Sequence, residues 1–83
     1  MNVTLRYFAS IREALGSGEV VELDPGITAG GVRDALIARG GAHAAALARG
    51  RVLRMALNQV LCDDSTVVAG DGELAFFPPV TGG

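Results

Sequence analysis

The sequence contains no tryptophan, no lysine, and only one cysteine and one histidine. All seven basic residues are arginines. Without lysine, the chain has neither the phosphate-binding lysine of a P-loop nor a nucleophile for Schiff-base chemistry. One cysteine and one histidine also cannot supply the four ligands of a closed zinc site, so no metal centre is expected. These absences argue against a self-contained enzyme.

Charge and cysteine content also limit location and partners. A single cysteine cannot form an internal disulfide, which fits a reducing compartment. The net charge of −2 and the pI of about 5.1 argue against the basic stripe of a nucleic-acid-binding domain. No apolar run approaches about 18 residues, and the first residues lack a signal-peptide pattern. We therefore expect a cytoplasmic domain with neither a nucleic-acid nor a membrane partner.

Hydrophobic residues make up 49% of the 83 residues, which is typical of one folded domain. The alternation in residues 2–8 places Val3, Leu5 and Tyr7 on one face of a strand. Ser10 is placed to cap the short helix that follows. Strands are expected at residues 2–8, 19–23, 52–57, 60–62 and 73–77, and short helices at residues 11–15 and 43–48.

The main helix is expected at residues 29–39, with Thr28 as its N-cap. Its apolar residues recur at intervals of three and four, and Arg33 is predicted to face water. Gly30 and Gly31 in its first turn each cost about 1 kcal/mol relative to alanine. Close approach of the helix to the sheet is the one reason that the sequence offers for these glycines.

The order of strand, short helix, strand, main helix and further strands predicts an α+β fold. Residues 2–8 and 73–77 are the most apolar strands, so we expect them to lie side by side at the centre of the sheet. A mixed sheet packed on one main helix, with short extra helices, is the ubiquitin-like β-grasp architecture. We expect this β-grasp domain to cover residues 1–79.

The sequence closes with Phe76-Phe77-Pro78-Pro79-Val80-Thr81-Gly82-Gly83. The two prolines end the last strand because proline donates no ladder hydrogen bond, so residues 80–83 are expected to form a flexible reactive tail. Four extended residues reach about 13 Å, and glycine lets a narrow channel close around the backbone. The Gly83 carboxylate is thus placed to enter a partner's active site. The alternative is a frayed chain end, which is common at termini.

The closing FFPPVTGG resembles the end of proteins in the MoaD/ThiS family of sulfur carriers, which includes the small subunit of molybdopterin synthase. The opening VTLRYFASIREALG is similar to that family's first strand and helix, and ALNQ at residues 56–59 to its central strand. The similarity spans essentially the whole chain. One departure is Gly70-Asp71-Gly72, where the family more often has an acidic Asp-Gly-Asp turn.

The resemblance implies a mechanism in which partners supply the catalytic groups. An E1-like adenylating enzyme would use ATP to activate the Gly83 carboxylate, and a sulfur donor enzyme would convert it to a thiocarboxylate. The tail, with Val80, Thr81 and Gly82 threaded into the large subunit of molybdopterin synthase, would deliver sulfur to a pterin precursor. No permanently bound cofactor is expected.

Strand phase separately predicts a docking surface. Phe8, Leu61 and Phe77 lie out of phase with the buried residues of their strands, and large apolar side chains that cluster on an outward face mark an interaction site. We expect these three to cluster beside the tail with Pro78 and Pro79, where the resemblance also places the partner. The alternative is that they are scattered exposed apolar residues, which are common.

Three further features favour structural roles. Cys62 is predicted to be a small buried hydrophobe, and His43, which lies among alanines, a surface or capping residue. Arg49, Arg51 and Arg54 form a basic cluster that is either a solvated edge or a means of steering an acidic partner.

Three other functions stay open on the sequence alone. One is a sulfur carrier for thiazole or another pathway, and another is a ubiquitin-like modifier joined through Gly83 to a target lysine. The third is an interaction domain with no reactive terminus. The Phe-Phe-Pro-Pro-Val-Thr before Gly-Gly favours the molybdopterin branch.

Overall fold

The computed structural model describes residues 1–79 as five strands and three helices. Their order along the chain is strand, helix, strand, two helices and three strands, as the sequence predicts. The elements are β1 (Asn2–Tyr7), α1 (Ala9–Leu15), β2 (Gly18–Glu22), α2 (Ala29–Ile37), α3 (Gly41–Ala46), β3 (Arg54–Leu57), β4 (Val60–Cys62) and β5 (Gly72–Phe77).

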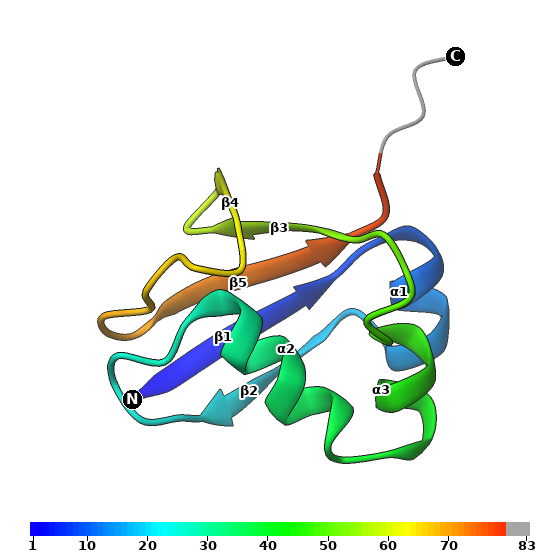
Figure 1. Ribbon diagram of the computed structural model, residues 1–83, viewed down its shortest axis with the longest axis horizontal. Helices are drawn as coiled ribbons and strands as arrows, with labels where there is room; N and C mark the ends of the chain where they lie inside the picture. Colours follow the sequence, from blue (N-terminus) through cyan, green and yellow to red (C-terminus); the bar gives the residue numbers. More distant parts are fainter. Residues whose placement is uncertain (80–83) are drawn as a thin grey trace.

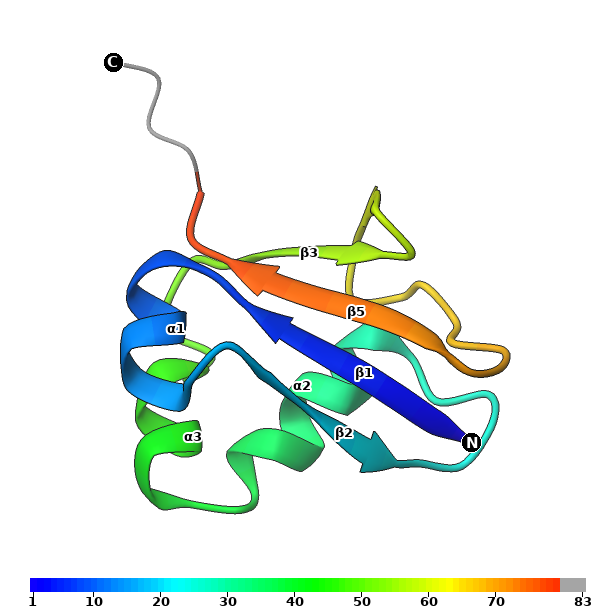
Figure 2. The ribbon, with the colours of Figure 1, turned by 180° about the vertical axis from the view of Figure 1, so that it is seen from behind.

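The five strands form one mixed sheet in the order β2-β1-β5-β3-β4 (Figure 1). The central pair, β1 and β5, is parallel, and the other three pairings are antiparallel. Helices α2 and α3 lie on one face of this sheet, and Figure 2 shows the opposite face in front of them. The predicted β-grasp fold and the central placement of the first and last strands are therefore confirmed.

The core lies between the sheet and α2. Val3, Leu5 and Tyr7 are buried while their neighbours along β1 are exposed, so the period-two pattern was interpreted correctly. Leu74 and Phe76 continue the same buried face on β5, and the Tyr7 and Phe76 ring centroids are 6.1 Å apart. Both central strands contribute large side chains to this buried face. The C-terminal end of β5 is therefore packed firmly against the core.

The first strand is one residue shorter and the first helix two residues longer than predicted. The chain leaves the sheet after Tyr7 because Ala9 adopts a positive φ of 54°. Phe8, not Ser10, is the N-cap of α1, and its carbonyl accepts hydrogen bonds from the amides of Ile11 and Arg12. The prediction for Ser10 was therefore wrong, because the helix begins before it.

Thr28 caps α2 as predicted, with its Oγ1 accepting a hydrogen bond from the Gly31 amide at 3.0 Å. The expected reason for Gly30 was wrong. A Cβ at Gly30 would lie 2.9 Å from the Cβ of Asp64, in the loop after β4, rather than against the sheet. The Gly30 amide also donates to the Asp64 carbonyl at 3.0 Å, so this glycine lets the loop cross the helix closely.

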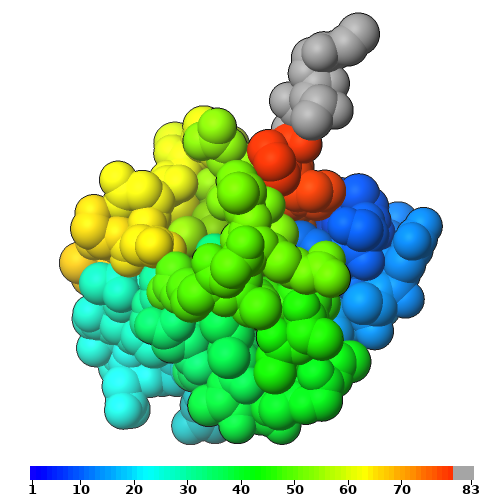
Figure 3. Space-filling model, turned by 45° about the vertical axis from the view of Figure 1, so that its right-hand side comes forward, coloured from blue at the N-terminus to red at the C-terminus, as the bar shows by residue number. Residues whose placement is uncertain are grey.

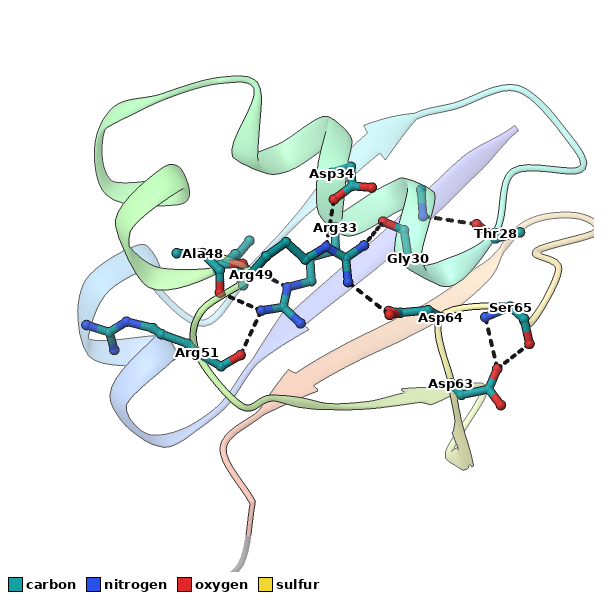
Figure 4. Close-up of polar contacts among 12 residues, drawn as sticks. Thr28, Gly30, Arg33, Asp34, Ala48, Arg49, Arg51, Asp63, Asp64 and Ser65 are labelled. Atoms are coloured by element: carbon teal, nitrogen blue, oxygen red, sulfur yellow. Dashed lines mark hydrogen bonds and ion pairs between the residues drawn. The ribbon is translucent and has the colours of Figure 1, made fainter.

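Arg33 is buried, contrary to the prediction that it faces water. Its Nε donates to the carbonyl of Leu47 at 2.8 Å, and its Nη2 donates to those of Ala48 at 2.6 Å and Arg51 at 3.0 Å (Figure 4). These carbonyls lie in the irregular segment between α3 and β3. The guanidinium therefore satisfies the Leu47 and Arg51 carbonyls, and it shares the Ala48 carbonyl with the backbone amide of Arg51.

Candidate functional site

The candidate site lies where β5 leaves the sheet, on the face opposite α2. Arg54, Leu61, Phe77 and Pro79 line a shallow hollow of about 270 Å³ there. Arg54 pairs with Phe77 across β3 and β5, which holds the two side chains side by side. In Figure 3, the end of β5, in red, lies between the blue N-terminal residues and the yellow-green region of β3 and β4.

A tight turn brings β4 to this hollow. Asn58 and Gln59 both have positive φ, 50° and 69°, the conformation of a two-residue type I′ hairpin turn. The turn fixes the register that pairs Leu61 with Ala56, and so places Leu61 on the outer face of the sheet. The side chain of Leu61 is 63% exposed, a large apolar surface at the edge of the hollow.

The structure thus unites three of the five predicted partner-binding residues. Leu61, Phe77 and Pro79 line the hollow, and the half-buried Pro78 joins two of them along the chain. Phe8 does not line it. Phe8 is 42% exposed, and its amide donates to the Phe76 carbonyl at 3.1 Å, so it lies at the same end of the sheet.

The sequence analysis named Arg54 only as part of a basic cluster and did not place it with the apolar residues of the hollow, whose charge it supplies. Arg54 alternates with the inward-facing Leu53 and Met55, so strand phase would have placed it on the outer face with Ala56. Within residues 1–79 it forms no ion pair, whereas Arg6 on the same face lies 3.7 Å from Glu73. Among the described residues, the hollow therefore combines apolar side chains with one positive charge that has no ion-pair partner.

The predicted reactive tail lies outside the described residues. Val80, Thr81, Gly82 and Gly83 continue directly from Pro79, which lines the hollow. The division into a domain of residues 1–79 and a tail of residues 80–83 stays a prediction.

The other two arginines of the predicted basic cluster do not line the hollow, and the side chain of Arg49 is bound within the fold. Arg49 donates to Asp34 at 2.8 Å, to Asp64 at 3.0 Å and to the Gly30 carbonyl at 2.9 Å (Figure 4). The hydrogen bond from Arg49 lowers the pKa of the Asp34 carboxyl group. The backbone of Arg51 accepts a bond from Arg33. Of the three arginines, only Arg54 belongs to the hollow.

His43 makes a side-chain contact that its prediction as a surface or capping residue did not include, whereas Cys62 is half-buried, close to its prediction as a small buried hydrophobe. His43 has an acidic neighbour that the sequence does not reveal, because its Nε2 lies 2.8 Å from Oε2 of Glu19, 24 residues away. Cys62 is half-buried, and burial raises the pKa of its thiol, which disfavours the nucleophilic thiolate. Across residues 1–79, no group of three His, Cys, Asp or Glu side chains could hold a metal ion.

Comparison with known proteins assigns the family. The ThiS family model matches residues 5–83, which is nearly the whole chain. The chain belongs to the ThiS family. The resemblance of its two ends to MoaD/ThiS proteins is thereby confirmed, and the matched region includes Gly82 and Gly83.

Two relatives of this ThiS-family chain carry the same name, molybdopterin synthase sulfur carrier subunit. The protein from Haemophilus influenzae is 42% identical over 77 residues, covering 93% of this chain and 94% of the relative. The Escherichia coli protein is 39% identical and covers 98% of this chain and 99% of the relative. Similarity thus extends over nearly the full length of both relatives.

Solved structures of similar proteins support the β-grasp fold, and one of them is a complex with a second subunit. SAMP1, the small archaeal modifier protein 1 of Haloferax volcanii, matches with a TM-score of 0.78 and 29% identity over the whole of both chains. One chain of a protein–protein complex of subunits 1 and 2 of the molybdopterin-converting factor from Helicobacter pylori matches with a TM-score of 0.69 and 25% identity, over the whole of this chain and of that chain. No helix within residues 1–79 is long and apolar enough to cross a membrane.

Proposed function

We propose that this ThiS-family chain is the sulfur carrier subunit of a molybdopterin synthase. The observation that carries the proposal is its full-length similarity, at 42% and 39% identity, to two proteins of that name. The family match runs through Gly83, the residue that would carry the sulfur. We place this activity in the cytoplasm, which agrees with the single cysteine of the sequence.

Gly83 would carry the reacting atom of this function. Its carboxylate is ionised at neutral pH and attacks the α-phosphorus of ATP in the adenylating partner, with pyrophosphate as leaving group. Sulfide-level sulfur supplied by a sulfur donor enzyme then attacks the acyl carbonyl of the Gly83 adenylate, the bond to AMP breaks, and a thiocarboxylate is left at Gly83. Val80, Thr81 and Gly82 thread this group into the large subunit, where sulfur passes to the pterin precursor. ATP belongs to the partner, and the carrier holds no permanent cofactor.

The hollow would be the docking surface for the large subunit. Leu61, Phe77 and Pro79 provide adjoining apolar surface, and Phe8 and Pro78 extend it at the same end of the sheet. Arg54 fits an acidic residue of the partner, since it has no ion pair within residues 1–79. The match to a subunit of a two-subunit complex supports this assignment.

Mass spectrometry of the intact protein tests the proposal. After incubation with the cognate adenylating enzyme, ATP and a sulfur donor, we expect the mass gain of one oxygen replaced by sulfur at Gly83. The second candidate is protein modification, favoured by the similarity to a small archaeal modifier protein. That function predicts a covalent conjugate instead. An unchanged mass with active partners contradicts both.

Gly82→Val separates the tail from the fold. A β-branched side chain next to the reacting residue should block the partner's channel, while the free energy of unfolding changes by no more than about 0.5 kcal/mol. We expect loss of adenylation or sulfur delivery, since a shift of about 1 Å at a reacting centre costs on the order of a hundredfold in rate. Normal sulfur transfer by this variant would exclude a tight channel.

A further inference from the structure

The β2 strand forms one edge of the sheet and presents free backbone groups. Met1 and Leu23 exchange hydrogen bonds in both directions, at 2.8 Å and 2.9 Å. Backbone groups of successive residues alternate in direction along an antiparallel pair, so Val21 and Glu19 also face β1. The N–H and C=O groups of Val20 and Glu22 therefore point away from the sheet, available to a further strand.

An apolar groove runs beside this edge. It lies between β2 and α2, has a volume of about 310 Å³, and is lined by Val21 and Leu23 from the strand side and by Val32, Ala35 and Leu36 from the helix. Figure 1 shows β2 and α2 as neighbours at the side of the sheet away from β4. A strand added to β2 would direct alternate side chains into this groove.

The charged residues around the groove differ in whether they form ion pairs. Arg39 lies on its rim, but its Nη1 is 2.6 Å from Oε1 of Glu19, which compensates its charge. Glu22, also on the rim, and Asp24, directly after Leu23, are exposed and form no ion pair within residues 1–79. Glu22 alternates with Val21 and Leu23, so its carboxylate projects on the outer face of the strand, and together with Asp24 it makes the edge near Leu23 acidic and complementary to lysine or arginine.

We propose that β2 and this groove bind an extended segment of a partner protein that combines apolar residues with neighbouring lysines or arginines. Backbone groups of Val20 and Glu22 pair with the added strand, an apolar side chain fills the groove, and the basic residues face Glu22 and Asp24. The exposed Val20 side chain, on the opposite sheet face, is covered by the other side of the same segment. This surface lies across the sheet from the hollow and does not depend on sulfur transfer.

Nuclear magnetic resonance titration with a synthetic peptide tests the proposal. The probe is an amidated Lys-Lys-Val-Ile-Val-Ile-Ser peptide, and its matched control carries Glu-Glu in place of Lys-Lys. We expect the basic peptide to shift the amide signals of Val20 and Glu22 saturably and to slow their hydrogen exchange at least tenfold. The acidic peptide should bind at least tenfold more weakly.

Variants of the full chain locate the binding surface. Glu22→Lys and Asp24→Lys should each weaken binding of the basic peptide at least threefold, whereas Glu13→Lys, the same charge change on exposed α1, should leave it unchanged. Ala35→Phe should fill the groove and abolish binding. Far-ultraviolet circular dichroism and a thermal melt confirm that each variant is folded.

Several results would overturn the proposal. One is an absence of saturable shifts with the folded wild-type chain, and another is equal binding of the acidic and basic peptides. Shifts confined to Leu61 and Phe77 would assign the peptide to the hollow. Dimerisation in sedimentation equilibrium, with protected Val20 and Glu22 amides in the absence of peptide, would assign the edge to a second copy of this chain.

Discussion

Glu19 joins three elements through its carboxylate. It accepts a hydrogen bond from the Tyr7 hydroxyl at 2.9 Å and pairs with Arg39 of the segment after α2 at 2.6 Å. His43 of α3 lies 2.8 Å away. Burial acts to raise the pKa of Glu19, but these hydrogen bonds outweigh it and lower the pKa from 4.5 to about 2. The charged form of Glu19 therefore stabilises the fold.

The pH dependence of stability should reflect this carboxylate. Because its folded-state pKa lies below the unfolded value, its contribution is complete above about pH 4.5 and is lost as the pH falls toward 2. Glu19→Gln should lower the free energy of unfolding at pH 7 by about 1–2 kcal/mol and flatten its slope in that window. Urea unfolding at a series of pH values measures this. Glu22→Gln, on the same strand and exposed, is the control, and an equal slope in both variants would contradict the assignment.

Arg33 should be far more important to stability than its charge suggests. Arg33→Met leaves the carbonyls of Leu47 and Arg51 without their donor and removes one of the two donors to the Ala48 carbonyl, and a buried unsatisfied polar group costs about 1–3 kcal/mol. We expect a loss of about 2 kcal/mol or more in denaturant unfolding. Arg12→Met, at an exposed position of α1, should change stability by less than about 0.5 kcal/mol. Equal effects of the two substitutions would show that the loop does not need the guanidinium.

At the scale of elements, the turn between β3 and β4 holds two parts of the sheet together. The backbone amide of Asn58 donates to the Glu73 carbonyl at 2.8 Å, and its side-chain oxygen accepts from the Glu73 amide at 2.9 Å. The turn thus holds the hairpin against the start of β5. Gln59 is the less favourable of the two turn residues, because a residue with a side chain is strained at this positive φ, whereas glycine adopts it without strain.

Gln59→Gly should therefore stabilise the protein. Asn-Gly is the preferred sequence for a type I′ turn, and we expect a gain of about 0.5–1 kcal/mol in the free energy of unfolding. Thermal and urea unfolding measure it. Gln59→Ala keeps a Cβ at the same φ and should give no gain. Destabilisation by glycine would mean that the Gln59 side chain makes a contact that outweighs the relief of strain.

The strands were predictable because their signal is local. Val3, Leu5 and Tyr7 alternate within seven residues, and a half-buried strand needs no further information. Arg33 was not predictable, because its acceptors lie 14 to 18 residues later in a loop without periodicity. The prediction for Gly30 was wrong for the same reason, because its neighbour Asp64 is distant in the sequence.

The candidate site was predictable only in part. Strand phase identified Leu61 and Phe77 as outward-facing, because an apolar residue out of phase with the core is visible locally. Arg54 was assigned to a basic cluster rather than to the hollow, because a charged residue on an outer face is ordinary and only its register opposite Phe77 connects it with the apolar residues. Phe8 was predicted to lie with Leu61 and Phe77. The chain leaves the sheet before Phe8, however, and the positive φ at Ala9 gives no signal in the sequence.

At the scale of the whole molecule, the hollow and the β2 groove lie toward opposite edges of one sheet. Phe77→Ala should weaken association with the large synthase subunit by about 2 kcal/mol or more, the range of an interface hot spot. Its effect on stability should be smaller, because Phe77 is only half-buried. Isothermal titration calorimetry and a thermal melt measure the two effects. Val20→Ala, 64% exposed on the same face beside the other edge, should leave this affinity unchanged. Retained affinity with a collapsed melt would make Phe77 a core residue.

The parallel pairing of β1 with β5 also governs how the protein is made. Val3 pairs with Gly72 and Tyr7 with Phe76, so the central ladder joins segments about seventy residues apart. During synthesis, β1, β2 and α2 leave the ribosome before β5 exists, and the buried face of β1 has no neighbour on that side. The sheet closes only after translation has passed Phe77. A chain terminated before β5 therefore lacks the strand that completes the central ladder, and cellular proteases meet it unfolded.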